Sequence, residues 1–172
     1  VEPTSSSSLK GLLARYGAVF NPKKTVVELN PLQQLAGGNP LTPIVTSYNK
    51  ESEITREAKQ ISLFPIATPI EKSEIQAEGL KVTSLFSTSA KSFESDLKDS
   101  QVKPNPKTDR KGPLSLALSI SGKISAKAEE SKPTQEPKSE TKKESEFRMV
   151  VVGDSDFASN SGRRFGINAD LF

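Results

Sequence analysis

The apolar residues of this chain follow two spacings, and each spacing predicts a type of secondary structure. Residues 9–16 carry leucines and a tyrosine at helical spacing, and Gly17 after them is suited to end the helix. Alternation at every second residue predicts strands at residues 80–86 (LKVTSLF) and 113–120 (PLSLALSI). Residues 147–152 (FRMVVV) form a nearly continuous apolar run, which is typical of a strand covered on both faces.

The other apolar segments predict shorter elements. Residues 25–29 are rich in β-branched side chains and predict a strand. Residues 61–69 (ISLFPIATP) alternate, but their two prolines restrict them to an edge or bulged strand. Residues 87–93 are predicted to be a loop, and a helix is expected to begin within residues 168–172 (NADLF).

The segment 121–146 has a different composition. It contains almost only Lys, Glu, Ser, Thr, Pro, Gln, Gly and Ala, with Ile124 as its one large apolar residue. Such a segment cannot bury enough apolar surface to offset the entropy lost on ordering, so most of it is predicted to be disordered. Because it joins two strands expected to be neighbours, it is interpreted as an expanded hairpin loop within one domain covering residues 1–172.

Composition excludes several classes of function. The chain has no Cys and no His, which rules out a disulfide scaffold, a Cys nucleophile and the commonest general base near neutral pH. Its 24 basic and 21 acidic residues leave a net charge of only +3, and lysines and glutamates interleave in the most charged stretch. No basic stripe with interleaved aromatic residues is present, so nucleic-acid binding is not expected. We expect no enzymatic activity and no cofactor.

Candidate chemistry gathers in the turn that follows the FRMVVV run, at Gly153, Asp154, Ser155, Asp156 and Asn160. In open α/β sheets, ligands bind beyond the carboxyl ends of the strands. Two carboxylates there could hold Mg²⁺ or Ca²⁺, but such a site needs further oxygen ligands that the sequence does not place. The favoured interpretation is therefore a structural or ligand-facing turn, with no catalytic, cofactor-binding or metal-binding residue assigned.

Two other uses of these residues remain open. A small-ligand or carbohydrate-binding module would use the loops at residues 37–40 (GGNP) and 153–160. A hydrolase would use Asp154 and Asp156 with a metal ion. Serine hydrolysis through Ser155 is not expected, because Phe157 replaces the second glycine of the G-x-S-x-G pattern and no His is available to activate the hydroxyl.

Several stretches, taken in order, resemble the ABC-type transport auxiliary family, which includes components of gliding-motility transporters. These stretches are residues 9–21 (LKGLLARYGAVFN), 37–48 (GGNPLTPIVTSY), Ile54-Thr55 with Phe64-Pro65, 109–118 (DRKGPLSLAL), and 149–160 (MVVVGDSDFASN) with 168–172. Together they cover most of the chain outside residues 121–146.

The resemblance implies a fold, a location and partners. The fold would be an α/β sandwich of the flavodoxin-like or class I glutamine-amidotransferase-like type, of which this chain would hold the later part. The domain would be a non-catalytic, extracytoplasmic auxiliary component on the periplasmic side of the inner membrane, anchored by segments outside this chain. Its partners would be the ABC permease and ATPase subunits of the same system and a homologous auxiliary subunit.

Overall fold

The computed structural model describes residues 1–3, 5–31, 38–75, 78–98, 101–105, 107–125 and 144–171. Strands dominate this part of the chain. The elements in order are α1 (Ser7–Arg15), β1 (Ala18–Phe20), β2 (Lys24–Glu28), β3 (Ile44–Val45), β4 (Ser47–Tyr48), β5 (Ser62–Leu63), β6 (Ile70–Lys72), β7 (Lys81–Ser87), β8 (Ser92–Lys98), β9 (Gln101–Lys103), β10 (Ser115–Ser125), β11 (Glu144–Val152), the 3-10 helices η1 (Asp156–Ala158) and η2 (Gly162–Arg164), and α3 (Asn168–Leu171).

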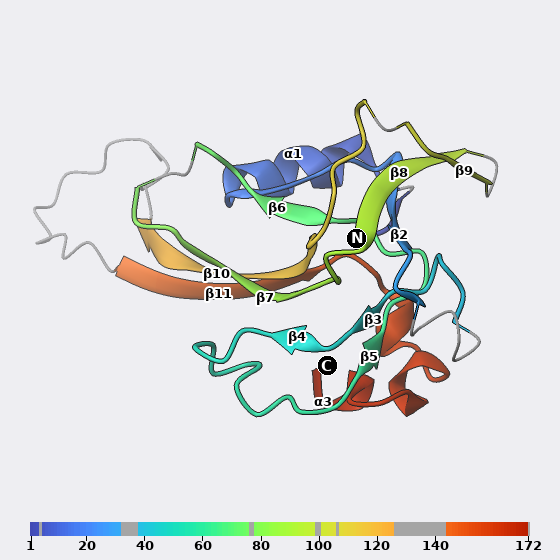
Figure 1. Ribbon diagram of the computed structural model, residues 1–172. Helices are drawn as coiled ribbons and strands as arrows, with labels where there is room; N and C mark the ends of the chain where they lie inside the picture. Colours follow the sequence, from blue (N-terminus) through green and yellow to red (C-terminus); the bar gives the residue numbers. More distant parts are fainter. Residues whose placement is uncertain are drawn as a thin grey trace, which may run out of the picture.

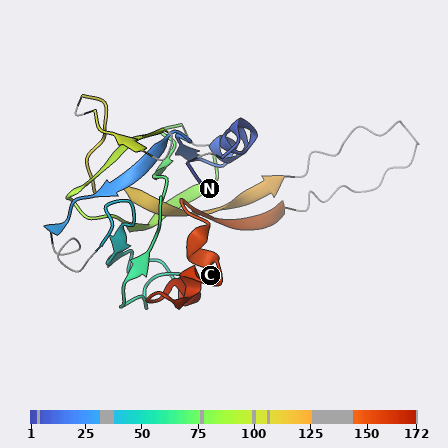
Figure 2. The same ribbon diagram turned by 90° about the vertical axis from the view of Figure 1, so that its right-hand side faces the viewer.

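The largest sheet has the strand order β11-β10-β7-β4, and its strands pair antiparallel. β10 and β11 form a long curved hairpin, and β7 lies along the other side of β10 (Figures 1 and 2). The pairing extends from Ala117 with Val152 to Ser125 with Glu144. The predicted adjacency of these two strands is therefore confirmed. Both flanks of the segment 121–146 lie in strands, while residues 126–143 fall outside the described residues.

Two hydrophobic clusters cover the two faces of this sheet. On one face, Leu13 of α1 and Ile70 of β6 pack against Leu118, Ile120 and neighbouring apolar residues. On the other face, β3, β5 and the C-terminal helices cover one half of the sheet (Figure 1). Alternation places Leu118 and Ile120 on the same face, because successive side chains point to opposite faces. Near the start of β10 the register with β7 shifts, and there the adjacent residues Leu116 and Ala117 both belong to the second cluster.

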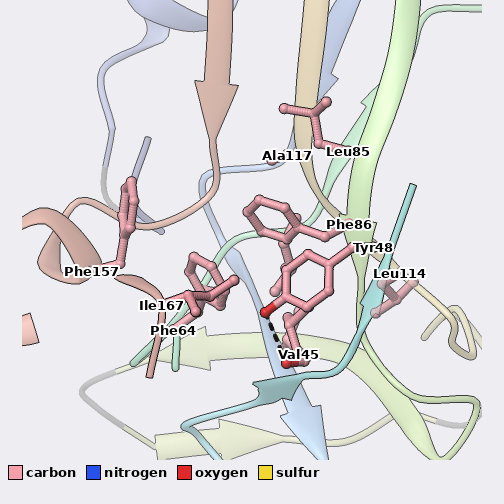
Figure 3. Packing of buried hydrophobic residues seen from close by; sticks show 12 residues of the cluster. Val45, Tyr48, Phe64, Leu85, Phe86, Leu114, Ala117, Phe157 and Ile167 are labelled. Atoms are coloured by element: carbon pink, nitrogen blue, oxygen red, sulfur yellow. Dashed lines mark hydrogen bonds between the residues drawn. The ribbon is translucent and has the colours of Figure 1, made fainter. Parts of the chain in front are cut away.

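Aromatic rings form the centre of the second cluster (Figure 3). Phe64 is fully buried and stacks on Phe86 with ring centroids 4.9 Å apart. Phe157 of η1 lies 5.6 Å from Phe64 on its other flank. The Tyr48 hydroxyl donates to the carbonyl of Val45 at 3.2 Å, which satisfies its polar end inside the apolar cluster.

The helix α1 forms where its leucine spacing predicts it. The Ser6 side chain accepts a hydrogen bond from the Leu9 amide at its start, and Gly17 follows its end with φ of 78°, which glycine adopts without strain. Leu13 is buried, whereas Leu12 on the flank of the same face is 50% exposed. None of the helices in the described part of the chain has the length and apolar composition needed to cross a bilayer.

The predicted α/β sandwich, flavodoxin-like or glutamine-amidotransferase-like, is wrong: the fold is mostly β. Within the described residues, the strands form small sheets whose pairs are all antiparallel, and only α1 has more than four helical residues. A parallel sheet needs a crossover of a dozen or more residues between strands, usually a helix. In the described part of the chain, the segments between paired strands contain no helix of more than four residues that could serve as such a crossover. The pairs are antiparallel whether the two strands are close in sequence, as β8 and β9 are, or far apart, as β1 and β6 are.

Two local predictions are also corrected. β11 is an edge strand with one covered face, because its exposed side carries Arg148 and Val150, and Val150 is 48% exposed. Residues 87–93 were predicted to be a loop, but β8 begins at Ser92. β8 pairs antiparallel with β2, and the paired residues run from Glu28 with Ser92 to Lys24 with Asp96. The polar composition of β8 concealed this strand, since its buried residues include Glu94, which pairs with Arg110, and Ser95.

Candidate functional site

The acidic turn is positioned by close backbone contacts at the end of β11. The Gly153 amide donates to the Leu116 carbonyl at 2.8 Å, and the Thr68 amide donates to the Gly153 carbonyl at 2.6 Å. A side chain at Gly153 would collide with the Thr68 carbonyl oxygen. Glycine is required here for close approach of the backbones rather than for an unusual dihedral angle. The turn therefore leaves the sheet in a fixed direction.

Asp154 is buried in this turn and is only 1% exposed. Its Oδ1 accepts a hydrogen bond from the Asp156 amide at 2.7 Å, which helps to hold the turn in place. Its Oδ2 is buried and has no hydrogen-bond partner among the described residues. Burial, with the nearby charges of Glu2 and Asp156, raises the pKa of the Asp154 carboxyl to about 7.

Glu2 completes a group of three carboxylates that the sequence did not reveal. The amide and hydroxyl of Ser155 both donate to Glu2 Oε1, at 2.6 and 2.5 Å. Glu2, Asp154 and Asp156 each place a carboxylate oxygen so that the three atoms lie within 4.8 Å of one another. The Val1 nitrogen donates to the Val152 carbonyl at 2.6 Å, which holds the N-terminal segment against β11. No motif links Glu2 to this turn, so only the fold could identify it.

The remaining predicted site residues do not join this group. Ser155 is exposed, and its hydroxyl is a hydrogen-bond donor to Glu2. Asn160 is exposed between η1 and η2. In the loop at residues 37–40, Gly37 lies outside the described residues, and the Asn39 side chain turns back to accept from the Leu41 amide at 2.9 Å. The structure therefore supports only the carboxylate part of the predicted turn as a cluster.

A groove of about 540 Å³ lies on the uncovered half of the main sheet, on the face opposite α1. The paired positions Thr83, Ser119 and Val150 share this face, as do Lys81, Ser121 and Arg148 one step along the strands. Residues 51–54 also line the groove and add two glutamates to the two basic side chains of the sheet. The groove thus combines hydroxyl groups with charges of both signs. Alternation in β7 and β10 predicts this polar face, but the contribution of residues 51–54 comes from the fold.

A second charged network lies on the small β2-β8-β9 sheet and is structural. Lys24 Nζ contacts Asp109 Oδ1 at 2.7 Å and Asp96 Oδ1 at 3.3 Å. Burial opposes ionisation of Asp109, but the Asn105 amide and the Lys24 ammonium outweigh it and hold the pKa of Asp109 below its usual value.

Arg110 extends this network by pairing with the carboxylates of Glu94 and Glu71. Burial raises the pKa of Glu94, against the opposing effects of the Lys24 charge and the Arg110 backbone. These pairs join β8 to the segment before β10. They explain why the stretch DRKGPLSLAL carries charges next to a buried strand.

Comparison with known proteins identifies one family. A family model described as "ABC-type uncharacterized transport system" matches residues 1–171. No curated protein and no solved structure matches the chain. The match covers the strands, the acidic turn and the groove together.

Proposed function

Since this chain belongs to the auxiliary family of ABC-type transport systems, we propose that it is a non-catalytic, extracytoplasmic domain of an export or gliding-motility type complex. Its partners are the permease and ATPase subunits of the same system, with a homologous auxiliary subunit as a further candidate. Membrane attachment comes from segments outside this chain. The observation that carries the proposal is the family match over residues 1–171.

The chemistry of the described residues supports a role without catalysis. The chain has no His and no Cys, so Ser155 lacks the usual base, and its hydroxyl donates to Glu2. The buried charges of Lys24, Asp109 and Glu94 are used in ion pairs that hold strands together. These features fit a domain that acts by contact with other subunits.

Co-purification of the full-length protein from solubilised membranes tests the proposal. A tag on the full-length protein is expected to recover the permease and the ATPase of the same system in stoichiometric amounts. Elution of the tagged protein as a single species without either subunit would contradict the proposed role.

A second candidate function, binding of a small ligand or carbohydrate, is favoured by the groove of about 540 Å³. Its hydroxyl groups and charges suit a hydrogen-bonding ligand, and its volume lies in the range of small-molecule sites. Its described lining contains no aromatic ring, so a sugar would be held by hydrogen bonds and charge alone.

A thermal-shift screen against glycans and small acids tests this candidate, because a ligand that binds only the folded state raises the melting temperature. Arg148→Ala should remove the shift, whereas Lys98→Ala, which changes an exposed lysine of β8 outside the groove, should keep it. Equal shifts in both variants would place the ligand elsewhere on the molecule.

A further inference from the structure

The three carboxylates at the end of β11 have the geometry of a shared cation site. Glu2, Asp154 and Asp156 each offer an oxygen within 4.8 Å of the other two. Two oxygens bound to one Ca²⁺ at about 2.4 Å lie about 3.4 Å apart at right angles and about 4.8 Å apart when opposite. Ca²⁺ accepts irregular coordination by about six to eight oxygens, whereas Mg²⁺ requires a near-ideal octahedron and keeps several of its waters. Three carboxylates supplied by separate parts of the chain therefore suit Ca²⁺ better than Mg²⁺.

A second observation independently indicates a ligand at this position. Asp154 is 1% exposed, and its Oδ2 has no hydrogen-bond partner among the described residues. A buried carboxylate oxygen without a donor has lost its hydration without compensation, which folded proteins generally avoid. A cation bound by this oxygen would provide the missing interaction. The Asp154 carboxylate also belongs to the group in which the three oxygens converge.

Neighbouring donors orient two of the carboxylates before any ligand arrives. The Asp156 amide occupies Oδ1 of Asp154, which leaves Oδ2 for another partner. The amide and hydroxyl of Ser155 fix Glu2 through its Oε1. Outer hydrogen bonds of this kind set the direction of metal-binding side chains and improve affinity.

We propose that Glu2, Asp154 and Asp156 bind a Ca²⁺ ion that ties the segment before α1 to the end of β11. The carboxylates supply the protein ligands, and water completes the coordination of about six to eight oxygens that Ca²⁺ prefers. The ion joins two parts of the chain that are 153 positions apart at the Ser155–Glu2 contact. This inference does not depend on the proposed transport role.

Calorimetric titration and thermal melting of the full chain, stripped with EDTA, test the proposal with CaCl2 and MgCl2. A partly exposed site with three carboxylates is expected to bind Ca²⁺ with a Kd of about 10⁻⁴ M. At a hundredfold excess over the Kd, mass action should raise the melting temperature by about 5–10 °C. Mg²⁺ at the same concentration should give a clearly smaller shift.

Substitutions distinguish the loss of cation binding from the stabilisation that results when repulsion between the carboxylates is removed. Asp154→Asn and Glu2→Gln should weaken Ca²⁺ binding at least tenfold, while each raises the melting temperature in EDTA by removing mutual repulsion. Asp170→Asn removes an exposed carboxylate of α3 and should leave both properties unchanged.

Three results would overturn the proposal. The first is that Ca²⁺ at about 10 mM, roughly a hundred times the expected Kd, produces neither binding heat nor a change in the melting temperature. The second is an equal shift in Asp154→Asn. The third is stabilisation by acid alone with no response to Ca²⁺, which would mean that the carboxylates share a proton instead.

Discussion

Replacement of Asp154 by Asn should stabilise the protein at neutral pH in the absence of divalent cations. Asp154 is 1% exposed, and burial, together with the charges of Glu2 and Asp156, raises the pKa of its carboxyl from 3.8 to about 7. Because the folded state binds this proton more tightly than the unfolded state, the ionised carboxyl destabilises the fold above pH 7. The penalty decreases as the pH falls toward 3.8 and is absent below it.

The size of the effect follows from the pKa values. A rise from 3.8 to about 7 corresponds to roughly 4 kcal/mol when the group is fully ionised in both states. Allowing for local relaxation, Asp154→Asn should be about 3 kcal/mol more stable than the wild type at pH 7.5 and within about 1 kcal/mol of it at pH 4. The amide keeps the shape of the side chain and gives the position of Oδ2 a donor.

Urea unfolding in EDTA at both pH values measures this difference directly. The comparison of wild type with variant cancels the pH dependence of the other carboxylates, including that of Asp109, whose lowered pKa acts in the opposite direction. An Asp154→Asn protein that is less stable at pH 7.5, or a difference that does not change with pH, would refute the argument from burial and charge.

Three other substitutions test the packing and the ion pairs by equilibrium unfolding. Gly153→Ala should destabilise the fold by about 3 kcal/mol or more, because its Cβ would collide with the Thr68 carbonyl; an unchanged midpoint would mean that the two backbones separate easily. Phe64→Ala should cost about 3–5 kcal/mol, since the ring is fully buried between two others, and a loss below 1 kcal/mol would contradict this packing. Lys24→Met should lower the free energy of unfolding by about 2–4 kcal/mol at pH 7, because Asp109 keeps a charge without its partner. This loss of stability should shrink as the pH falls and Asp109 is protonated. A loss that is constant with pH would argue against the ion pair.

The local pattern of the sequence determined the elements whose formation depends on near neighbours. Helical spacing and Gly17 predicted α1 and its end, and period-two alternation predicted β7 and β10. The pairing of β10 with β11 was predicted because the polar segment 121–146 lies between these two strands in the sequence and was interpreted as their connecting loop. These features are decided within a few residues, where the geometry of helix and strand sets which side chains share a face.

Only the tertiary structure decided how these elements combine. β8 has a polar sequence, and it is a strand because β2 pairs with its backbone and Arg110 pairs with its buried Glu94. The antiparallel order replaced the expected α/β sandwich, because strand direction depends on the connections between strands and not on the alternation within them. Glu2 reached Asp154 and Asp156 through folding of the whole chain, and no local pattern marks such an encounter. The sequence thus specified the acidic turn, and the third carboxylate that makes it a candidate cation site came from distant packing.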